Sequence, residues 1–334
     1  MNTPRFSVII PTFNRQEQLR ACLHALAEQT LDPSDFEVIV AIDGSNDGTR
    51  EMVSEFHAPF HLRALVLEHG GASRARNAGA DAAIGEYLAF TEDDVIPDPY
   101  WLAHAQKHIL EGNPDILEGR TVYTHSRSSV RRFEPRGIPS FIPCNLFVRR
   151  QVFRAVGGYA LDFFDRESGL YFREDSDLGF RLLDAGHMVF LAQDVLVAHP
   201  PQFGTLRGCI RHARRYFFDP LLYKRHPRRY RMGIEVKEIA GISVRRPQHY
   251  VALAALAALL ACAAGVIAGS GVLISLGALA VVFCGFLFRQ KYQGWAALNP
   301  LEIHKTIGFS AVPFVYLFSL LRGCIRYRSF RILL

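Results

Sequence analysis

Three adjacent acids, Glu92, Asp93 and Asp94, directly follow a short apolar run at residues 87–90. Carboxylates this close repel one another unless a cation neutralises them. Alternate residues of an extended chain point to the same side, so Glu92 and Asp94 could act together as ligands. Oxygen ligands suit Mg²⁺ or Mn²⁺, and such an ion would in turn bridge a diphosphate. The alternative at this point is a solvated acidic turn.

A second acidic cluster, which includes Glu174 and Asp175, opens a predicted helix at residues 172–183. Three leucines of this segment have the spacing of a core-facing helix side. Acids in a first helical turn interact favourably with the helix dipole, so capping explains them on its own. A carboxylate beside a diphosphate site could equally act as general base and take the proton from an attacking hydroxyl.

Polar turns also end the first two predicted strands. Pro11, Thr12 and Phe13 end the first strand, and Asp43 ends the second before the turn at residues 44–49. A carboxylate at a strand end can hold a ribose hydroxyl or a base, and glycines beside it let a flat ring approach the backbone. Turn chemistry followed by a helix N-cap is the competing explanation.

Arg74 and Arg76 lie at the start of a further predicted helix, just after two glycines. A guanidinium and the free N–H groups of a helix start can face a phosphate, although a surface arginine pair explains the pattern equally well. The chain has neither a Walker motif nor a GxGxxG fingerprint, which disfavours P-loop and dinucleotide-binding proteins.

Strand and helix patterns alternate from residue 6 to about residue 203, and this alternation positions the polar segments. It is typical of βαβ units and predicts an α/β fold with a mostly parallel sheet and helices on both faces. Ligands of such sheets lie at the carboxyl ends of the strands. The expected strands cover residues 6–10, 36–42, 62–67 and 87–90, and the expected helices cover 16–29, 49–56 and 73–83.

Charge is distributed unevenly along the 334 residues, of which 49% are hydrophobic. Residues 1–204 carry 19 Lys and Arg against 28 Asp and Glu, residues 205–246 carry 12 against 3, and residues 247–334 carry 7 against 1. An acidic front and a basic rear with long uncharged runs indicate an anionic membrane surface rather than nucleic acid as the partner. We predict a catalytic domain, a basic interfacial segment and a transmembrane region over these three ranges.

Two uncharged runs, at residues 249–268 and 272–288, each come close to the roughly 20 residues that cross a bilayer as a helix. Basic residues flank their outer ends, which places both ends, and the domain before them, in the cytoplasm of a multi-pass protein of the cell membrane. A third run at 306–321 is short, contains Pro313 and is followed by four arginines, so a re-entrant or interfacial helix competes with a third span.

The basic segment repeats arginine at three- and four-residue spacing, with aromatic residues between. This pattern fits an amphipathic helix on an anionic bilayer or a grip on a diphosphate-linked lipid, and a plain electrostatic anchor is the alternative. The arginines are Arg207, Arg211, Arg214 and Arg215. The scattered cysteines and the absence of a secretory signal pattern favour a cytosol-facing catalytic part without a disulfide framework or zinc site.

Taken together, these segments resemble the family 2 glycosyltransferases of the GT-A fold. The resemblance rests on VIIPTFNR, AIDGSNDGT, GGASRARNAG, FTEDDVIP in the place of the DxD motif, CNLFVRRQVFRAVGGY, and FREDSDLGFRLLDAG in the place of the ED motif. It covers about 200 residues in family order. It implies inverting transfer of a sugar from a nucleotide-diphosphate sugar, with one base and a Mg²⁺ or Mn²⁺ ion.

The resemblance also implies roles for single residues. Asp175 corresponds to the catalytic base, and Glu92 and Asp94 correspond to the outer acids of the DxD motif, which contact ribose and metal. His199 stands where some relatives have a third metal ligand, although a histidine after an apolar strand is more often structural. The nucleotide-sugar pocket is expected from Pro11, Thr12, Phe13, Asp43, Arg76 and Asp93, and the acceptor side from Asn145, Gly158 and Glu174.

Two residues depart from the family pattern. Ile42 stands where many members have an aspartate, and Glu92 replaces the commoner aspartate with a side chain one methylene longer. Residues 211–218 match the Gln-x-x-Arg-Trp motif of processive synthases only in part, which disfavours a polymer synthase. We expect a membrane-anchored hexosyltransferase that adds one sugar to a lipid-linked or cell-envelope glycan acceptor. Transfer to a polyprenyl phosphate, and a catalytically silent membrane scaffold that binds a nucleotide sugar, are the alternatives.

Overall fold

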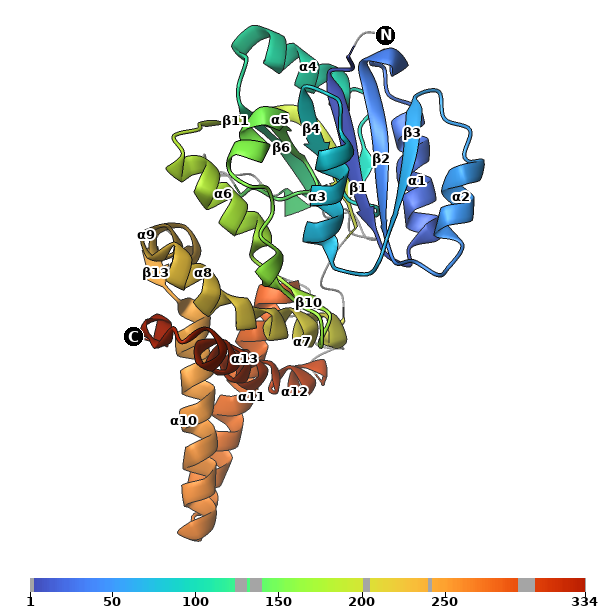
Figure 1. Cartoon of the computed structure of the whole chain (residues 1–334). Coiled ribbons are helices and arrows are strands. Elements are labelled where there is room, and N and C mark those ends of the chain that lie inside the picture. Colours follow the sequence, from blue (N-terminus) through green and yellow to red (C-terminus); the bar gives the residue numbers. More distant parts are fainter. Residues whose placement is uncertain are drawn as a thin grey trace. The chain divides into compact units, whose positions relative to one another are not determined.

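The computed structural model describes residues 3–123, 131–132, 140–200, 205–239, 242–293 and 304–333. The chain divides into two compact units, Met1–Pro201 and Gln202–Leu334 (Figure 1). The predicted boundary after residue 204 adjoins residues 201–204, which lie outside the described residues.

The first unit is built on a sheet of nine strands. Their order is β3-β2-β1-β4-β8-β6-β11-β5, and β7 pairs with β6. β1 to β4 pair in parallel, as do β6 and β11, whereas β8 and β5 run antiparallel to their neighbours. The predicted α/β architecture is confirmed, and antiparallel strands from the later part of the chain extend it. The strands are β1 (Phe6–Thr12), β2 (Phe36–Asp43), β3 (His61–Leu67), β4 (Tyr87–Phe90), β5 (Ile96–Pro97), β6 (Ile116–Tyr123), β7 (Arg131–Arg132), β8 (Leu146–Arg149) and β11 (Val189–His199).

Each face of the sheet carries its own hydrophobic core. Val8 and Ile10 of β1 pack with Leu23 on one face, whereas Ile9 packs with Leu178 on the other, and all five side chains are fully buried. Successive strand residues point to opposite faces, so a strand covered on both sides is a continuous apolar run. Helices α1 (Gln16–Ala27), α2 (Thr49–Glu55) and α4 (Trp101–Gly112) contribute to the first core, and α3 (Ala72–Ala82), α5 (Arg150–Ala155) and α6 (Glu174–Asp184) contribute to the second.

The second unit contains a long helical hairpin. α10 (Pro247–Ile267) and α11 (Gly271–Gln293) pack closely, because a Cβ atom at Gly277 would lie 2.6 Å from the sulfur of Cys262. The far end of the hairpin stands clear of α12 and α13 (Figure 1). Large apolar side chains remain exposed along both helices, including Leu260, Ile267 and Leu279.

Three helices of the described chain are long and apolar enough to cross a membrane, judged by length and composition. The first two are the predicted runs, and the third covers Lys305–Tyr327. This third stretch is broken at residues 310–311 into α12 (Lys305–Phe309) and α13 (Val312–Tyr327). Pro313 lies in the first turn of α13, where its missing N–H group has no helical partner to lose.

The predicted basic helix is confirmed as α7 (Leu206–Arg215). Cys209 and Ala213 are buried, whereas Arg207, Arg211 and Arg214 are exposed on the opposite face. The apolar side of α7 packs on α13, so the arginine side is left to face solvent or a partner. The second unit also contains α8 (Asp219–Arg225), α9 (Pro227–Arg229), β12 (Val236–Ile239) and β13 (Ile242–Arg245).

The first unit contains, besides its main sheet, the short strand pair β9 (Phe164–Asp165) and β10 (Leu170–Tyr171).

Candidate active site

The polar segments predicted to carry chemistry meet at the carboxyl edge of the sheet. β2, β1 and β4 are neighbours and end at Asp43, Thr12 and Phe90, and β11 ends at His199. Because parallel strands all point the same way, the segments that follow them gather at one edge. Contacts there therefore join residues that are far apart in the sequence.

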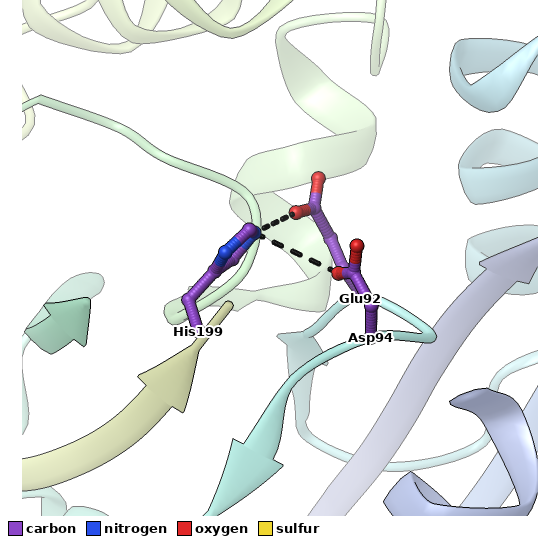
Figure 2. Close-up of side chains that lie close together, drawn as sticks. All are labelled: Glu92, Asp94 and His199. Atoms are coloured by element: carbon purple, nitrogen blue, oxygen red, sulfur yellow. Dashed lines mark hydrogen bonds and ion pairs between the residues drawn. The ribbon is translucent and has the colours of Figure 1, made fainter. Parts of the chain in front are cut away.

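Glu92, Asp94 and His199 form a tight cluster (Figure 2). Their potential ligand atoms all lie within 4.8 Å of one another. His199 Nε2 lies 3.2 Å from Oε2 of Glu92 and 3.6 Å from Oδ1 of Asp94. This Asp94 oxygen is buried and has no hydrogen-bond partner among the described residues. The structure therefore brings together the two predicted DxD acids and the histidine.

The His199 ring is held from its other side. Nδ1 lies 2.7 Å from the carbonyl oxygen of Pro200, which can only accept, so Nδ1 carries the proton and Nε2 faces the acids. Burial lowers the pKa of His199, but the hydrogen bond and charge of Glu92 outweigh burial and raise it. Burial likewise acts to raise the pKa of Glu92, and His199 and Arg76 bring it below its usual range.

Arg15, from the turn after β1, neutralises part of the acid triplet. Its Nη1 atom lies 2.8 Å from Oδ2 of Asp94 and 3.0 Å from Oδ1 of Asp93. Burial raises the pKa of Asp93 to about 6, although Arg15 opposes the increase. The sequence does not predict this partner, because 78 residues separate Arg15 from Asp93.

Arg76, near the start of α3, joins the acid cluster to the start of α6. Its side chain is buried, and Nη2 donates to Oε1 of Glu92 over 3.0 Å. Nη1 lies 3.7 Å from Oε1 of Glu174, and the guanidinium carbon lies 5.4 Å from the centre of the Tyr159 ring. One buried cation thus contacts both acidic clusters. Its predicted place near the nucleotide stays a prediction.

The turn that contains Gly158 ties α3 to α6. Asn77 of α3 donates to the Tyr159 carbonyl over 2.8 Å and accepts from the Tyr159 amide over 2.9 Å. Arg181 of α6 donates to the Gly158 carbonyl over 2.6 Å. Gly158 has φ of +65°, and a Cβ atom there would lie 2.8 Å from the Asn77 amide oxygen, so this close approach requires glycine. Close packing therefore explains why position 158, which is predicted to lie on the acceptor side, is a glycine.

Asp175 lies in the first turn of α6 and is half-buried. Its Oδ1 atom accepts a hydrogen bond of 2.6 Å from the amide of Ser176. Burial raises the pKa of Asp175, and the charge of Arg173 and the Ser176 hydrogen bonds oppose this. Arg173 itself has φ of +76°, in the left-handed region that a side chain rarely adopts. The predicted core side of α6 is confirmed by the burial of its leucines.

Asp43 ends β2, which lies on the opposite side of β1 from β4 and the acid triplet, and Phe13 follows β1 itself. The two oxygens of Asp43 accept from the amides of Gly70 and Gly71, each over 2.8 Å. His69 Nδ1 lies 3.0 Å from Asp43 Oδ2, and its ring stacks on Phe13 with ring centres 4.3 Å apart. Phe13 is 43% exposed, so an open aromatic surface lies beside a buried carboxylate. Such a pair suits a flat, polar ring.

Four other positions named in the sequence analysis are buried within the fold. Pro11 and Thr12 belong to β1, and Ile42, which replaces an aspartate of the family pattern, is 1% exposed. Asn145 donates to the carbonyls of residues 120 and 195 and accepts from the indole of Trp101. These bonds join β6, β11 and α4, so the amide has a structural role. Its part in acceptor binding stays a prediction.

The fold and the site define a class of enzyme, and comparison with known proteins identifies the family. Residues 7–161 match the model of glycosyl transferase family 2. The glycosyltransferase AglE of Haloferax volcanii is 30% identical over 220 residues, which are 61% of this chain and 69% of that protein. The chain belongs to the family 2 glycosyltransferases.

Two further relatives extend the comparison. A PGL/p-HBAD biosynthesis glycosyltransferase of Mycobacterium bovis is 30% identical over 245 residues, 71% of this chain and 89% of that protein. The fold is similar to that of the mannosyltransferase PcManGT from Pyrobaculum calidifontis, solved in complex with GDP-mannose and Mn²⁺. That similarity covers 96% of this chain and 88% of the other, with a TM-score of 0.62 and 20% identity, and it confirms the GT-A fold.

Proposed function

We propose that this family 2 glycosyltransferase is an inverting, metal-dependent enzyme that uses a nucleotide-diphosphate sugar at the cytoplasmic face of the cell membrane. The observation that carries the proposal is the Glu92–Asp94–His199 cluster, which the buried Arg76 joins to Glu174, the residue next to Asp175. A cation site and a candidate base thus lie at two ends of one network of charges.

The donor set of the cluster fits a divalent cation. Two carboxylates and an imidazole suit Mn²⁺ or Mg²⁺, and Nδ1 of His199 is fixed by a backbone carbonyl, as in many metal-binding histidines. The buried Oδ1 atom of Asp94 faces His199 and has no hydrogen-bond partner among the described residues, so it is available as a ligand atom. A bound cation would neutralise the diphosphate of the donor as it leaves. The solved mannosyltransferase with GDP-mannose and Mn²⁺ supports both the donor class and the cation.

Other residues of the chain bind the donor and accept the proton of the acceptor. The exposed Phe13 ring and the buried Asp43 carboxylate bind the nucleoside part. Asp175 takes the proton of the acceptor hydroxyl, which attacks the anomeric carbon from the side opposite the leaving diphosphate. The raised pKa of Asp175 makes the carboxylate a stronger base once it is ionised. The positive charge of Arg76 reduces the electrostatic repulsion between the two acidic clusters, because it lies close to both Glu92 and Glu174.

The second unit supports a membrane location and a lipid-linked or envelope-glycan acceptor. α10 and α11 expose apolar side chains along their length, which suits a hydrocarbon environment. Basic residues lie at the outer ends of the hairpin, and this bias favours the cytoplasmic side for them. The exposed arginine side of α7 suits anionic lipid headgroups.

Transfer to a polyprenyl phosphate is a second candidate, and one observation favours it. Arg173 precedes the candidate base and contributes a positive charge to its surroundings. A cation there would suit an acceptor that is already an anion and needs no base. Asp175→Asn separates the two reactions, because a hydroxyl acceptor should lose most of its turnover and a phosphate acceptor should retain it.

The test is a donor and metal screen with the full-length protein purified in detergent. UDP-, GDP- and dTDP-sugars are offered with Mn²⁺, with Mg²⁺ and with EDTA, and release of nucleoside diphosphate is measured. We expect one donor base to be turned over, and turnover to stop with EDTA. Turnover that is insensitive to EDTA would refute the cation site, and the absence of binding and turnover of all donors would refute the donor class.

A further inference from the structure

Phe141 has an unusual backbone conformation close to the acceptor side. Its φ is +55°, although the residue is bulky and its side chain is 3% exposed. Left-handed backbone angles are strained for large residues and persist only where the surroundings enforce them. The contacts of Phe141 show which residues enforce its left-handed conformation.

A buried carboxylate holds the segment that contains Phe141. Oε2 of Glu118, in β6, accepts from the amide of Ser140 over 2.9 Å and from the amide of Phe141 over 3.1 Å. The Ser140 hydroxyl donates to the other oxygen, Oε1. Glu118 is 4% exposed, so a charge has been removed from water in order to make these bonds. The carboxylate therefore fixes the left-handed turn.

The Phe141 ring packs against α6 at Gly179. A Cβ atom at Gly179 would lie 2.2 Å from the ring carbon Cδ2 of Phe141, so the ring occupies the place where any other side chain would begin. Gly179 lies four residues after Asp175 in the same helix. Residues four apart lie on the same side of a helix, one turn above the other. Phe141 thus contacts α6 one turn below the candidate base, on the side from which Asp175 projects.

The charge of Asp175 also acts on Glu118, and a Coulomb interaction is mutual. Burial raises the pKa of Glu118, its hydrogen bonds with Ser140 and Phe141 oppose this, and Asp175 adds a further increase. The two carboxylates therefore interact across the interior. Among the described residues, Arg173 and Arg76 act on Asp175 through their charge, Asp175 acts on Tyr159, and Glu174 and Asp177 lie in the same helical turn.

We propose that Glu118, Phe141 and Gly179 are positioning residues that hold Asp175 in place. Glu118 holds Phe141 in its left-handed turn, and the ring, seated on the bare backbone of Gly179, fixes the first turns of α6. The inference rests on the proposed function, in which Asp175 is the base. It adds Glu118 and Phe141, which lie outside the family-like motifs, and it gives Gly179, which lies in the same motif as Asp175, a structural reason.

The test uses the full-length protein with the donor that the screen above identifies. Glu118→Gln keeps the side-chain shape and one carbonyl oxygen for the backbone amides, but it removes the negative charge and replaces the other acceptor oxygen with an NH₂ donor. Gly179→Ala places a methyl group against the Phe141 ring. We expect each variant to lose at least 10-fold in kcat, while binding of the nucleoside diphosphate with Mn²⁺ stays within about 2-fold. Matched controls are Glu17→Gln on the exposed side of α1, and Gly112→Ala in α4, where a Cβ atom would lie 3.9 Å from Cδ of Pro114.

A pH profile separates positioning from mere packing. Asp175 must be ionised to act, so kcat rises with pH through its pKa. Glu118→Gln removes a neighbouring negative charge, lowers the pKa of Asp175 and moves this acidic limb of the profile to lower pH. A uniform loss of kcat with an unmoved limb would show that Glu118 only packs, and would overturn the assignment.

The outcomes distinguish this inference from the proposed function. Retention of hydroxyl transfer by Asp175→Asn would refute the base itself. Loss of transfer in Asp175→Asn, together with wild-type kcat and pH limb in Glu118→Gln and Gly179→Ala, would refute only the positioning role. If Glu118→Gln does not fold, Ser140→Ala removes a single hydroxyl from the carboxylate, and unchanged kcat and pH limb in that variant and in Gly179→Ala would refute the role equally.

Discussion

Arg15 occupies one oxygen of a carboxylate whose other oxygen belongs to the candidate cation site. Its Nη1 atom lies 2.8 Å from Oδ2 of Asp94, while Oδ1 of Asp94 faces His199 and Glu92. A guanidinium in this position repels a divalent cation held by the same carboxylate. We therefore predict that Arg15→Gln binds Mn²⁺ more tightly than the wild-type protein in the absence of nucleotide.

The size of the effect follows from Coulomb's law. A cation on the far oxygen of Asp94 would lie roughly 5 Å from the guanidinium, and one charge against two at an effective dielectric constant of about 40 to 80 gives about 2 to 3 kcal/mol. The Arg15 side chain is 47% exposed, so water and salt reduce this further. We expect about 1 to 2 kcal/mol, which is about a 5- to 30-fold lower Kd for Mn²⁺.

The assay is titration of the full-length protein with Mn²⁺, in which free Mn²⁺ is counted by electron paramagnetic resonance. Arg20→Gln, on the exposed surface of α1 beside Glu17, is the matched control and should leave the Kd unchanged. The gain in Arg15→Gln should shrink in high salt, because exposed charges are screened. A Kd that is unchanged or higher in Arg15→Gln at low salt would refute the reasoning, since Arg15 would then not compete for the acids.

Three further predictions concern the same unit. His199→Ala should raise the Kd for Mn²⁺ by at least about 10-fold in the same titration, because one of three candidate ligands is lost; an unchanged Kd would exclude the histidine as a ligand. Asn145→Ala should lower the free energy of unfolding by about 3 to 5 kcal/mol, because a buried indole N–H and two carbonyls lose their partner. Chemical denaturation measures this. Normal stability with a raised KM for the acceptor would instead support the predicted acceptor role. In a profile of kcat against pH, activity should fall with decreasing pH as Asp175 becomes protonated. Because its pKa is raised, this fall should occur above the ordinary aspartate pKa of about 3.9. A fall at or below that pH would show that burial does not raise the pKa of Asp175.

Local features of the fold are predictable because their signals are adjacent in the sequence. The apolar run of β1 and the turn residues after it lie within ten positions, and the predicted strands and helices up to Phe90 end within two residues of the observed ones. Likewise, the acids at residues 92–94 and Asp175 can be found from the sequence, because each cluster follows a strand end or opens a helix.

The contacts between these clusters are not predictable in the same way. The His199–Glu92 pair joins residues 107 positions apart, and it exists because β11 and β4 end at the same edge of the sheet. The sequence shows only an apolar run before the histidine, which is the signal of any buried strand. Phe141 and Glu118 lack even such a signal, because a left-handed phenylalanine and a buried glutamate both contradict local preferences. Only the assembled fold explains them.

The buried guanidinium of Arg76 has a thermodynamic consequence. Glu92 and Glu174 share this single positive charge, so neutralisation of Glu92 by another cation leaves more of the charge for Glu174. Binding at the two acidic clusters is then linked, and by reciprocity each substrate changes the affinity for the other by the same factor. We expect changes at the two carboxylates to be non-additive in a double-mutant cycle.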